Sequence, residues 1–303
     1  MRDCPPDGQA RRRSWERSVF APRALGFPWA VPDDDDDDEG QGCGDARQVT
    51  FRRRGIGYVV TGGTGDGAAL SIPAIHDGLP VVGVGDRAFR GAGLRRVTIP
   101  EGLTHIGDGA FAGNLLASLS IPDSVTHVGR GAFHMCGIAS VAIGGGVTHI
   151  GDGAFSSNRL SSVAIPGSVA RIGDDAFVFN FLLAGVTIGR GVASIGDRAF
   201  AYASLDGVVI PDSVTSIGDG AFFDAGLAAV AIPGSVASVG GWAFAGAGLG
   251  RVAVPFESLA AADAAWGSRP GRCRKWRLGM PRGAAWVFRP RLWAAAGGFG
   301  PRP

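Results

Sequence analysis

The feature that most constrains this chain is a repeat of 22 residues. Each copy closes on an Ala-Phe pair, and one spacing in the series is 23 residues instead of 22. The repeat phenylalanines are Phe89, Phe111, Phe133, Phe155, Phe177, Phe200, Phe222 and Phe244. A fixed period of this length predicts a solenoid, because each unit can bury its apolar face only against its neighbours.

The consensus sequence of the repeat predicts short strands and turns. The unit reads Leu-x-x-Val-x-Ile-Pro-x-Ser-Val-Thr-x-Ile-Gly-Asp-x-Ala-Phe, as in residues 160–177. Alternation at Val-x-Ile indicates a strand, and the following Pro ends it because Pro has no N–H to donate. Val-Thr-x-Ile predicts a second extended piece, and Gly-Asp predicts a turn that carries the Phe ring into the core. We therefore expect two strips of stacked parallel strands with little helix.

Composition divides the chain into three parts. Residues 1–50 carry 7 Arg against 11 acids, including the run from Asp33 to Glu39, whereas residues 257–303 carry 9 basic residues against 2 acids. We expect residues 1–48 to be a disordered acidic segment and residues 49–256 to be the solenoid. Residues 257–303 then form a short capping helix, over residues 259–266, and a basic tail rich in Arg, Trp and Pro.

The N-terminal end of the solenoid needs a cap, because its first coil has no preceding neighbour. Residues 58–61 and 69–73 both have strand character and are separated by the glycine-rich residues 62–67. The economical prediction is a hairpin that pairs these two strands and covers the open end.

The repeat resembles the leucine-rich repeat of the BspA-like type. Residues 210–222, Ile-Pro-Asp-Ser-Val-Thr-Ser-Ile-Gly-Asp-Gly-Ala-Phe, carry the resemblance most clearly, and residues 58–89 resemble the N-terminal cap and first unit of that family. The resemblance implies a curved right-handed solenoid of about eight coils that binds proteins, often in adhesion or cell-surface recognition. Units here are mostly one residue shorter than is common in the family, and a cysteine ladder is absent.

The variable positions supply the candidate binding residues. Aromatic residues gather on the turns of the fifth to seventh coils, at Phe179, Phe181, Tyr202 and Phe223. Exposed aromatic side chains are typical of protein interfaces, although rings that merely pack on one another would give the same pattern. Arg95 and Arg96 in the first coil are further candidates, on a strand face that is otherwise lined by small residues.

A second column of interest holds histidine. His105, His127 and His149 recur every 22 residues, so stacking places them about 5 Å apart on one strip. Such a row suits a metal ion or an acid sensor, whereas Arg171 and Ser194 in the same column indicate simply an exposed position.

No motif in the sequence indicates an enzyme or a cofactor. The four cysteines, Cys4, Cys43, Cys136 and Cys273, lack a metal-binding spacing, and no signal peptide or membrane span is visible. A cytoplasmic location follows by default, with the cell surface or secretion as the alternative that the family resemblance implies. We expect a non-catalytic module that binds a protein partner. The alternative is a nucleic-acid or anionic-surface binder that uses the basic residues 257–303.

Overall fold

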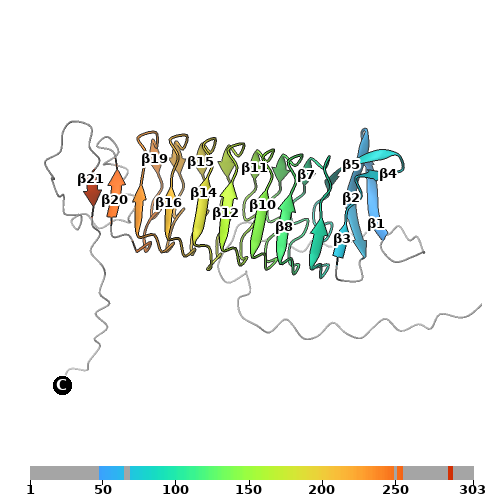
Figure 1. The fold of residues 1–303 in the computed structure, drawn as a ribbon, viewed down its shortest axis with the longest axis horizontal. Helices are drawn as coiled ribbons and strands as arrows, with labels where there is room; N and C mark the ends of the chain where they lie inside the picture. Colours follow the sequence, from blue (N-terminus) through green and yellow to red (C-terminus); the bar gives the residue numbers. More distant parts are fainter. Residues whose placement is uncertain (1–47, 65–68, 249–250, 255–285, 289–303) are drawn as a thin grey trace, which may run out of the picture. The chain divides into compact units, whose positions relative to one another are not determined.

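The computed structural model describes residues 48–64, 69–248, 251–254 and 286–288. Within these residues the chain is a β-solenoid of stacked coils without a helix, as the repeat predicts (Figure 1). No helix in the described residues has the length and apolarity needed to cross a membrane. The expected N-terminal acidic segment, most of the basic tail and the expected helix over residues 259–266 lie outside the described residues.

One face of the solenoid is a continuous parallel sheet, which we call the long sheet. Its repeating members are two-residue strands that end in Ile or Val, with that apolar residue turned inward. These strands are β7 (His105–Ile106), β9 (His127–Val128), β11 (His149–Ile150), β13 (Arg171–Ile172), β15 (Ser194–Ile195), β17 (Ser216–Ile217) and β19 (Ser238–Val239). Each strand pairs in parallel with the strand one repeat later.

The opposite face carries the Val-x-Ile strands in three separate blocks, which we call the segmented sheet. β3 pairs with β6, β8 pairs with β10, and β12 begins a block that continues through β14, β16, β18 and β20. The strands are β3 (Ala69–Ser71), β6 (Arg96–Thr98), β8 (Ser118–Ile121), β10 (Ser140–Ile143), β12 (Ser162–Ile165), β14 (Gly185–Ile188), β16 (Gly207–Val209), β18 (Ala229–Ala231) and β20 (Arg251–Val254). At the break between β10 and β12, Val141 and Ile143 are half-buried, whereas Val163 and Ile165 are buried.

An N-terminal hairpin is present, but the prediction of which two strands pair in it is wrong. Strand β2 (Gly57–Thr64) forms an antiparallel hairpin with the preceding β1 (Gln48–Arg54), and it continues the long sheet through β5 (Leu79–Val84). The predicted partner, β3, pairs in parallel with β6, because coil stacking sets Leu70 beside Val97 in one core column. A small strand, β4 (Ile75–His76), pairs antiparallel with β5.

The C-terminal end differs from the expectation at one point. Within the basic tail, β21 (Trp286–Phe288) pairs antiparallel with β20 and extends the last block of the segmented sheet. A second strand beside β20 satisfies backbone groups that a terminal strand would otherwise leave open.

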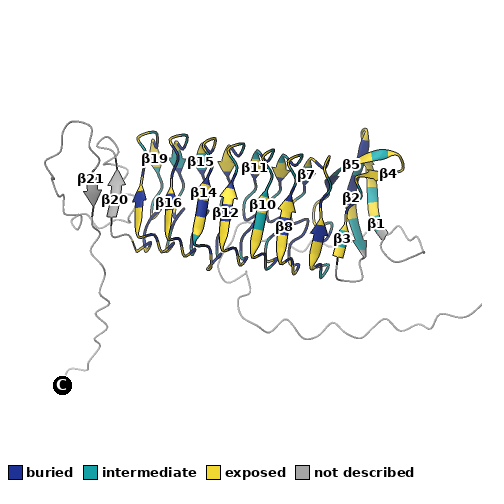
Figure 2. Cartoon of the chain, in the orientation of Figure 1, coloured by how far each residue is buried: buried dark blue, intermediate teal, exposed yellow. Residues whose placement is uncertain are grey.

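A column of stacked phenylalanine rings fills the core. All eight repeat phenylalanines are buried, with relative exposures of 0–2%. Neighbouring rings are nearly parallel, and their centroids lie 5.3–5.5 Å apart. Figure 2 shows the matching alternation in the strands, where buried residues alternate with exposed ones. Each ring therefore packs against both adjacent coils.

Buried asparagines form a polar ladder beside the rings. Asn158 donates through its side-chain nitrogen to the carbonyl oxygens of Phe133 and Phe155, and its side-chain oxygen accepts from the backbone N–H of Cys136 and Ile138. Asn114 and Asn180 repeat this arrangement. These amides satisfy backbone groups at a buried turn, where unsatisfied groups would be costly.

The Gly-Asp turns form a third ladder. In this column the aspartate carboxylate accepts a hydrogen bond from the backbone N–H one coil later, as from Asp219 N to Asp197 Oδ1 at 2.7 Å. The preceding glycine is required because the backbones come close: a Cβ at Gly129 would lie 2.6 Å from Asp108 Oδ1. The aspartates thus link adjacent coils.

The ring column predicts a large cost for removing one ring. Replacing Phe155 with Ala leaves a cavity shared by two neighbouring coils, and we expect a loss of about 3–5 kcal/mol in the free energy of unfolding. Chemical denaturation followed by circular dichroism measures this change. A loss below about 1 kcal/mol would show that the ring is not part of the core.

Candidate interaction surface

Two residues in each Phe turn adopt a left-handed backbone. These are the second residue before the repeat Phe and the second residue after it, and φ is positive at both in every repeat from Phe89 to Phe244. Glycine is the residue best suited to such a backbone, and it occupies seven of these sixteen positions. The other nine carry side chains, which are Arg87, Met135, Ser157, Asp175, Phe179, Arg198, Tyr202, Asp224 and Trp242.

Two of these side chains are large aromatics on adjacent coils. Phe179 has φ of 58° and Tyr202 has φ of 59°. A left-handed backbone costs a non-glycine residue on the order of 1–2 kcal/mol, and bulky residues there are uncommon. Phe179 and Tyr202 therefore hold a backbone conformation that glycine would adopt at lower cost.

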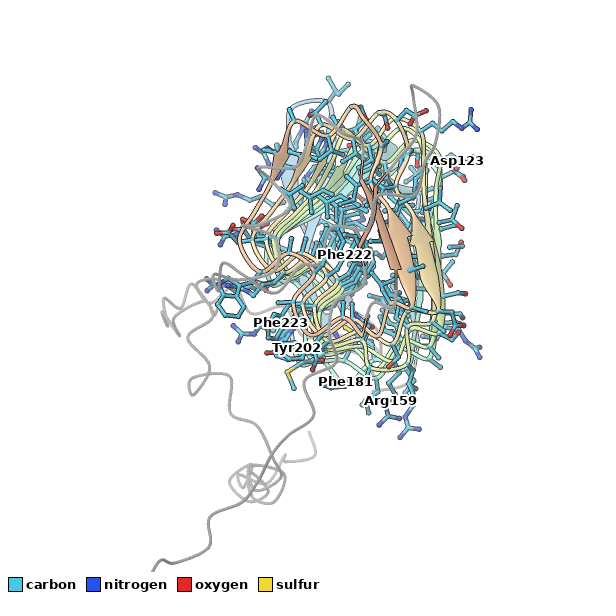
Figure 3. All side chains as sticks on the ribbon, turned by 90° about the vertical axis from the view of Figure 1, so that its left-hand side faces the viewer. Asp123, Arg159, Phe181, Tyr202, Phe222 and Phe223 are labelled. Atoms are coloured by element: carbon cyan, nitrogen blue, oxygen red, sulfur yellow. The ribbon has the colours of Figure 1, made fainter. Side chains whose placement is uncertain are left out.

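The predicted aromatic residues come together in one row. The centroid of Phe179 lies 5.8 Å from that of Phe181 and 5.0 Å from that of Tyr202, and Tyr202 meets Phe223 edge to face at 5.5 Å. We call these four residues the aromatic ridge. Figure 3 shows Phe181, Tyr202 and Phe223 along one side of the coils, with Phe222 turned into the interior.

The inserted residue of the 23-residue unit explains the most exposed part of the ridge. Where the preceding unit has only Arg159, this unit has Phe181 and Leu182, which are 61% and 62% exposed. The backbone around them is held, because Leu183 N donates to Asn180 O and the Ser204 hydroxyl donates to Phe181 O. The two side chains therefore project outward from a fixed turn. Sequence reasoning missed Leu182, although the altered spacing pointed to it.

A buried ion pair lies on the other left-handed column of the same coils. Asp175 is 1% exposed, and Arg198 binds it through two hydrogen bonds, from Nε to Oδ1 at 2.7 Å and from Nη2 to Oδ2 at 2.6 Å. The hydrogen bond to Asp175 is the main cause that raises the pKa of Arg198. Sequence reasoning missed this pair, and its one signal was that Asp175 and Arg198 stand where Gly109, Gly131, Gly153 and Gly220 stand in other units.

Trp242 is a further exposed aromatic that sequence reasoning missed. It occupies a left-handed position with φ of 61°, and 58% of its surface is exposed. The sequence contains one indication of it, because Trp242 replaces the glycine that several other units have at this position, namely Gly109, Gly131, Gly153 and Gly220.

The histidine column forms as predicted, with one stacked pair. The rings of His127 and His149 are parallel within 7° and their centroids lie 4.7 Å apart. His105 instead lies over Gly83, where a Cβ would fall 2.7 Å from its Nδ1. Burial lowers the pKa of His105, and the charges of Arg54 and His127 lower it further.

Threonine hydroxyls orient two of these imidazoles. The Thr148 hydroxyl donates to Thr126 O at 3.0 Å and lies 2.8 Å from His149 Nδ1. The threonine hydroxyl thus links the ring nitrogen to the backbone of the preceding coil. Thr126 and His127 repeat the arrangement. In the part of the chain that the structure describes, no three His, Cys, Asp or Glu side chains are grouped to hold a metal ion, and a metal role stays a prediction.

Arg95 and Arg96 lie apart from the aromatic ridge. Both are exposed at or beside β6, toward the N-terminal end of the solenoid, whereas the ridge lies on the turns after Phe177, Phe200 and Phe222. The structure does not join the two sets into one site. Binding by these arginines stays a prediction.

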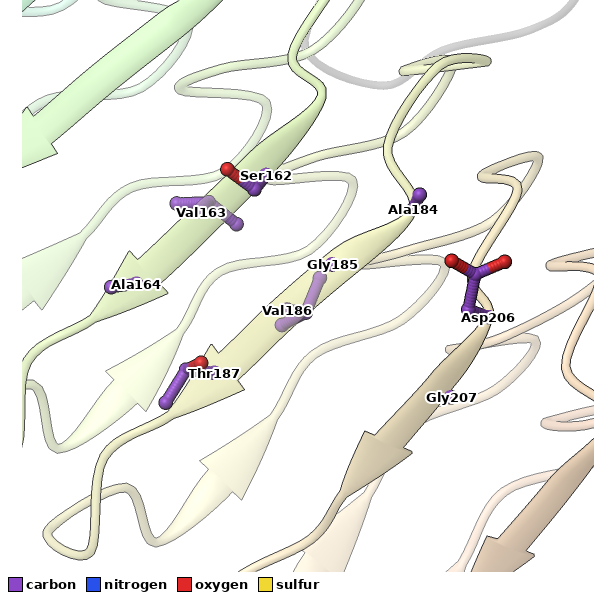
Figure 4. A pocket seen from close by; sticks show the side chains of 9 residues that line it. All are labelled: Ser162, Val163, Ala164, Ala184, Gly185, Val186, Thr187, Asp206 and Gly207. Carbon is purple, nitrogen blue, oxygen red and sulfur yellow. The ribbon is translucent and has the colours of Figure 1, made fainter.

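The outer face of the segmented sheet has one shallow depression among the described residues. An open depression of about 390 Å³ crosses β12, β14 and β16 because glycines and small side chains leave it unfilled (Figure 4). Its lining consists of Ser162, Val163, Ala164, Ala184, Gly185, Val186, Thr187, Asp206 and Gly207. This face offers no large side chain at its centre to anchor a partner.

The stacked coils, the Leu, Val, Ile and Phe columns and the exposed turn residues together define a leucine-rich-repeat solenoid. The family model of the BspA type leucine-rich repeat region matches residues 82–206 and 193–263, in six copies. These stretches cover more than half of the chain, and the chain belongs to this family. The matched family model describes a repeat region.

Solved structures of bacterial leucine-rich repeat proteins are similar to this chain. A leucine-rich repeat protein of T. pallidum (TpLRR) is 30% identical with a TM-score of 0.53, over 66% of this chain and 87% of that one. A leucine-rich repeat protein from Bacteroides ovatus is 20% identical with a TM-score of 0.49, over 71% of each chain. The pneumococcal vaccine antigen PcpA is 16% identical with a TM-score of 0.48, over 69% of this chain and 68% of that one. A comparison of the sequence with curated proteins found no match.

The buried ion pair predicts a non-additive double substitution. Arg198→Ala leaves the buried Asp175 carboxylate without its partner, and we expect it to lower the free energy of unfolding by about 3 kcal/mol. Replacing Asp175 and Arg198 together with Gly gives both positions the residue found in other units, and we expect a value within about 1 kcal/mol of wild type. Urea unfolding of the three proteins measures this, and equal losses in both variants would contradict it.

A second prediction concerns pH. Burial lowers the pKa of His134 from 6.5 to about 4. As the pH falls below 6.5, the unfolded chain binds a proton that the folded His134 does not, so stability is lost until the pH nears 4. Between about pH 7 and about pH 4.5, the free energy of unfolding of the wild-type chain should fall because of this group. We expect His134→Gln to reduce that fall by up to about 3 kcal/mol. Identical pH profiles for the two proteins would contradict the assignment.

Proposed function

We propose that this chain is a non-catalytic binding module that recognises a protein partner through the aromatic ridge. The observation that supports the proposal most is the placement of Phe179 and Tyr202 at left-handed positions. Large side chains there cost backbone free energy that glycine would avoid. Such a cost is retained when the side chains serve another purpose, and partner binding is the purpose that exposed aromatics serve best.

The surroundings of the ridge suit this role. Phe181 and Leu182 project from a turn whose backbone is hydrogen-bonded to the next coil, so they are ordered before a partner arrives. Pre-ordered aromatic groups lose little conformational freedom on binding, and this favours affinity. The coil stacking behind them provides a rigid support. Adhesion or cell-surface recognition is the biological setting that the family resemblance favours.

Glycine substitution separates binding from stability. In the double variant Phe179→Gly, Tyr202→Gly, the lost ring contacts, worth about 0.5–1.5 kcal/mol, oppose the relieved backbone cost of similar size. We therefore expect the free energy of unfolding to change by less than about 2 kcal/mol, while capture of the protein partner is lost. Thermal unfolding and affinity capture with the full chain measure the two effects.

The segmented sheet provides a matched control for the ridge variant. Val209 on β16 is 81% exposed on the segmented sheet, away from the ridge, and Val209→Ser should leave capture unchanged. The proposal fails if the ridge variant captures the same partners as wild type, or if Val209→Ser removes them equally.

A further inference from the structure

The last strand directs the chain toward the edge of the solenoid that carries the aromatic ridge. Strand β21 runs antiparallel to β20, as Figure 1 shows, and Phe288 at its end pairs with Val252 near the start of β20. Each strand of the segmented sheet begins just after a Phe turn, and β20 follows the turn of Phe244. Residues 289–303 therefore leave the sheet at the Phe-turn edge.

The connection between β20 and β21 starts from the other edge. Val254, the last residue of β20, pairs with Trp286, the first residue of β21. Residues 255–285 thus begin and end where the strands of the segmented sheet end, away from the Phe turns. Of the two stretches of the basic tail that adjoin β21, only residues 289–303 start on the side of the ridge.

These fifteen residues are long enough to cross the whole ridge. The turns that carry the ridge lead into β14, β16 and β18, and the strand order β14-β16-β18-β20-β21 places β21 four strands from β14. At about 4.8 Å per strand, the ridge extends to roughly 19 Å from β21 along the solenoid. Fifteen extended residues span up to about 50 Å.

Two exposed aspartates stand beside the ridge. Asp224 directly follows Phe223, and Asp206 directly precedes β16 on the coil of Tyr202. The Asp224 carboxylate leans toward the next coil, in the direction of β20, because a Cβ at Gly246 would lie 3.2 Å from its Oδ1. The ion pairs found within the described ranges use other residues, so both carboxylates are available to a cation.

The composition of residues 289–303 complements this surface. The segment contains three arginines and no acid, and its large apolar residues are Leu292, Trp293 and Phe299. Arginine pairs with exposed carboxylates, and Trp and Leu pack on aromatic rings. The segment therefore carries the two kinds of side chain that the ridge and its aspartates accept.

The order of residues in the segment also follows the order of groups on the surface. After β21 the chain has Arg289 and Arg291 first, and Leu292 and Trp293 follow. Arg291 is three residues beyond β21, a reach of about 10 Å, and the turn of Asp224 leads into β18, which lies two strands or roughly 10 Å from β21. The arginines thus reach the aspartates as the apolar residues reach the rings.

From this direction, reach and chemistry we propose that residues 289–303 fold back over the aromatic ridge and cover it. Arg289 and Arg291 pair with Asp206 and Asp224, and Trp293 packs on the rings. The inference rests on the proposed function of the ridge as a protein-binding surface, because the segment and a partner compete for it. A tethered segment binds at a high effective concentration, so a modest contact suffices. Covering the ridge lowers the apparent affinity for a partner by the fraction of chains in which the ridge is open.

The two tyrosines of the chain allow a direct test, because Tyr202 belongs to the ridge and Tyr58 lies on β2 at the N-terminal end. We expect tetranitromethane to nitrate Tyr202 about fivefold or more slowly in the wild-type chain than in the full-length variant Leu292→Ser, Trp293→Ser. Tyr58 should react at the same rate in both proteins. Peptide mass spectrometry over time measures the two rates, and added salt should speed the reaction of Tyr202 in the wild-type chain.

Charge exchange tests the proposed ion pairs. The double variant Asp206→Arg, Asp224→Arg and the double variant Arg289→Asp, Arg291→Asp each place like charges together, and both should remove the protection of Tyr202. Combining all four substitutions restores opposite charges and should return the nitration rate to within about twofold of wild type.

Matched controls lie on the far side of the coils. Glu101 and Asp212 are exposed and share the column of Asp123, which Figure 3 shows opposite Phe181 and Tyr202. Glu101→Arg with Asp212→Arg makes the same change in net charge and should leave the nitration rate of Tyr202 unchanged. Circular dichroism of every variant confirms that the fold is retained.

Three outcomes overturn the docking of this segment. The first is an equal nitration rate of Tyr202 in the wild-type chain and in the variant Leu292→Ser, Trp293→Ser. The second is a protection that grows with protein concentration, which assigns the cover to a second chain. The third is a fourfold charge exchange that fails to restore protection.

Capture of the protein partner reports on the proposed function separately. The variant Leu292→Ser, Trp293→Ser should capture about threefold more partner than wild type, and no increase contradicts competition for the ridge. If docking is absent but Phe179→Gly, Tyr202→Gly loses capture, the proposed function stands without this inference. If Tyr202 is protected but that ridge variant still captures the partner, the proposed function is wrong and the docking stands alone.

Discussion

The packing of one phenylalanine ring on the next is the interaction on which the solenoid depends. Each ring is buried by the coil before it and the coil after it, so no coil holds a complete core alone. The parallel strands and the turns are arranged around this column. Stability accordingly increases with each neighbour added, and the two ends, where β1 and β21 add antiparallel strands, are the places where the pattern must change.

Polar ladders make this stacking specific. The asparagine amides satisfy backbone groups within and between turns, and the aspartate carboxylates bond to the next coil. Apolar columns alone would tolerate a shift between coils, whereas these hydrogen bonds form in only one register. The same constraint explains the close glycines, since a Cβ at Gly129 would occupy the space of the preceding turn.

The sequence predicted the coils, the strands and the buried columns because each depends on a repeated apolar position. The grouping of Phe179, Phe181, Tyr202 and Phe223 followed from the same alignment, since residues one repeat apart become neighbours. The partner of β3 was wrong because strand character does not say whether a strand pairs with its sequence neighbour or with the next coil. The bidentate ion pair of Asp175 and Arg198 was missed, because a charged residue in a turn is normally expected to be exposed. Only the backbone conformation shows that the Asp175 side chain is buried and faces Arg198.

The left-handed positions have a consequence for how such surfaces diversify. Each Phe turn presents two positions that glycine fills at least cost, and where such a position faces solvent, as at Met135 and Trp242, a side chain alters the surface without entering the core. New recognition properties can thus arise by single substitutions, each carrying a backbone cost of about 1 kcal/mol that sums along the solenoid. A long array tolerates more of these substitutions than a short one. Repeat number therefore sets an upper limit on how much surface variety this architecture can sustain.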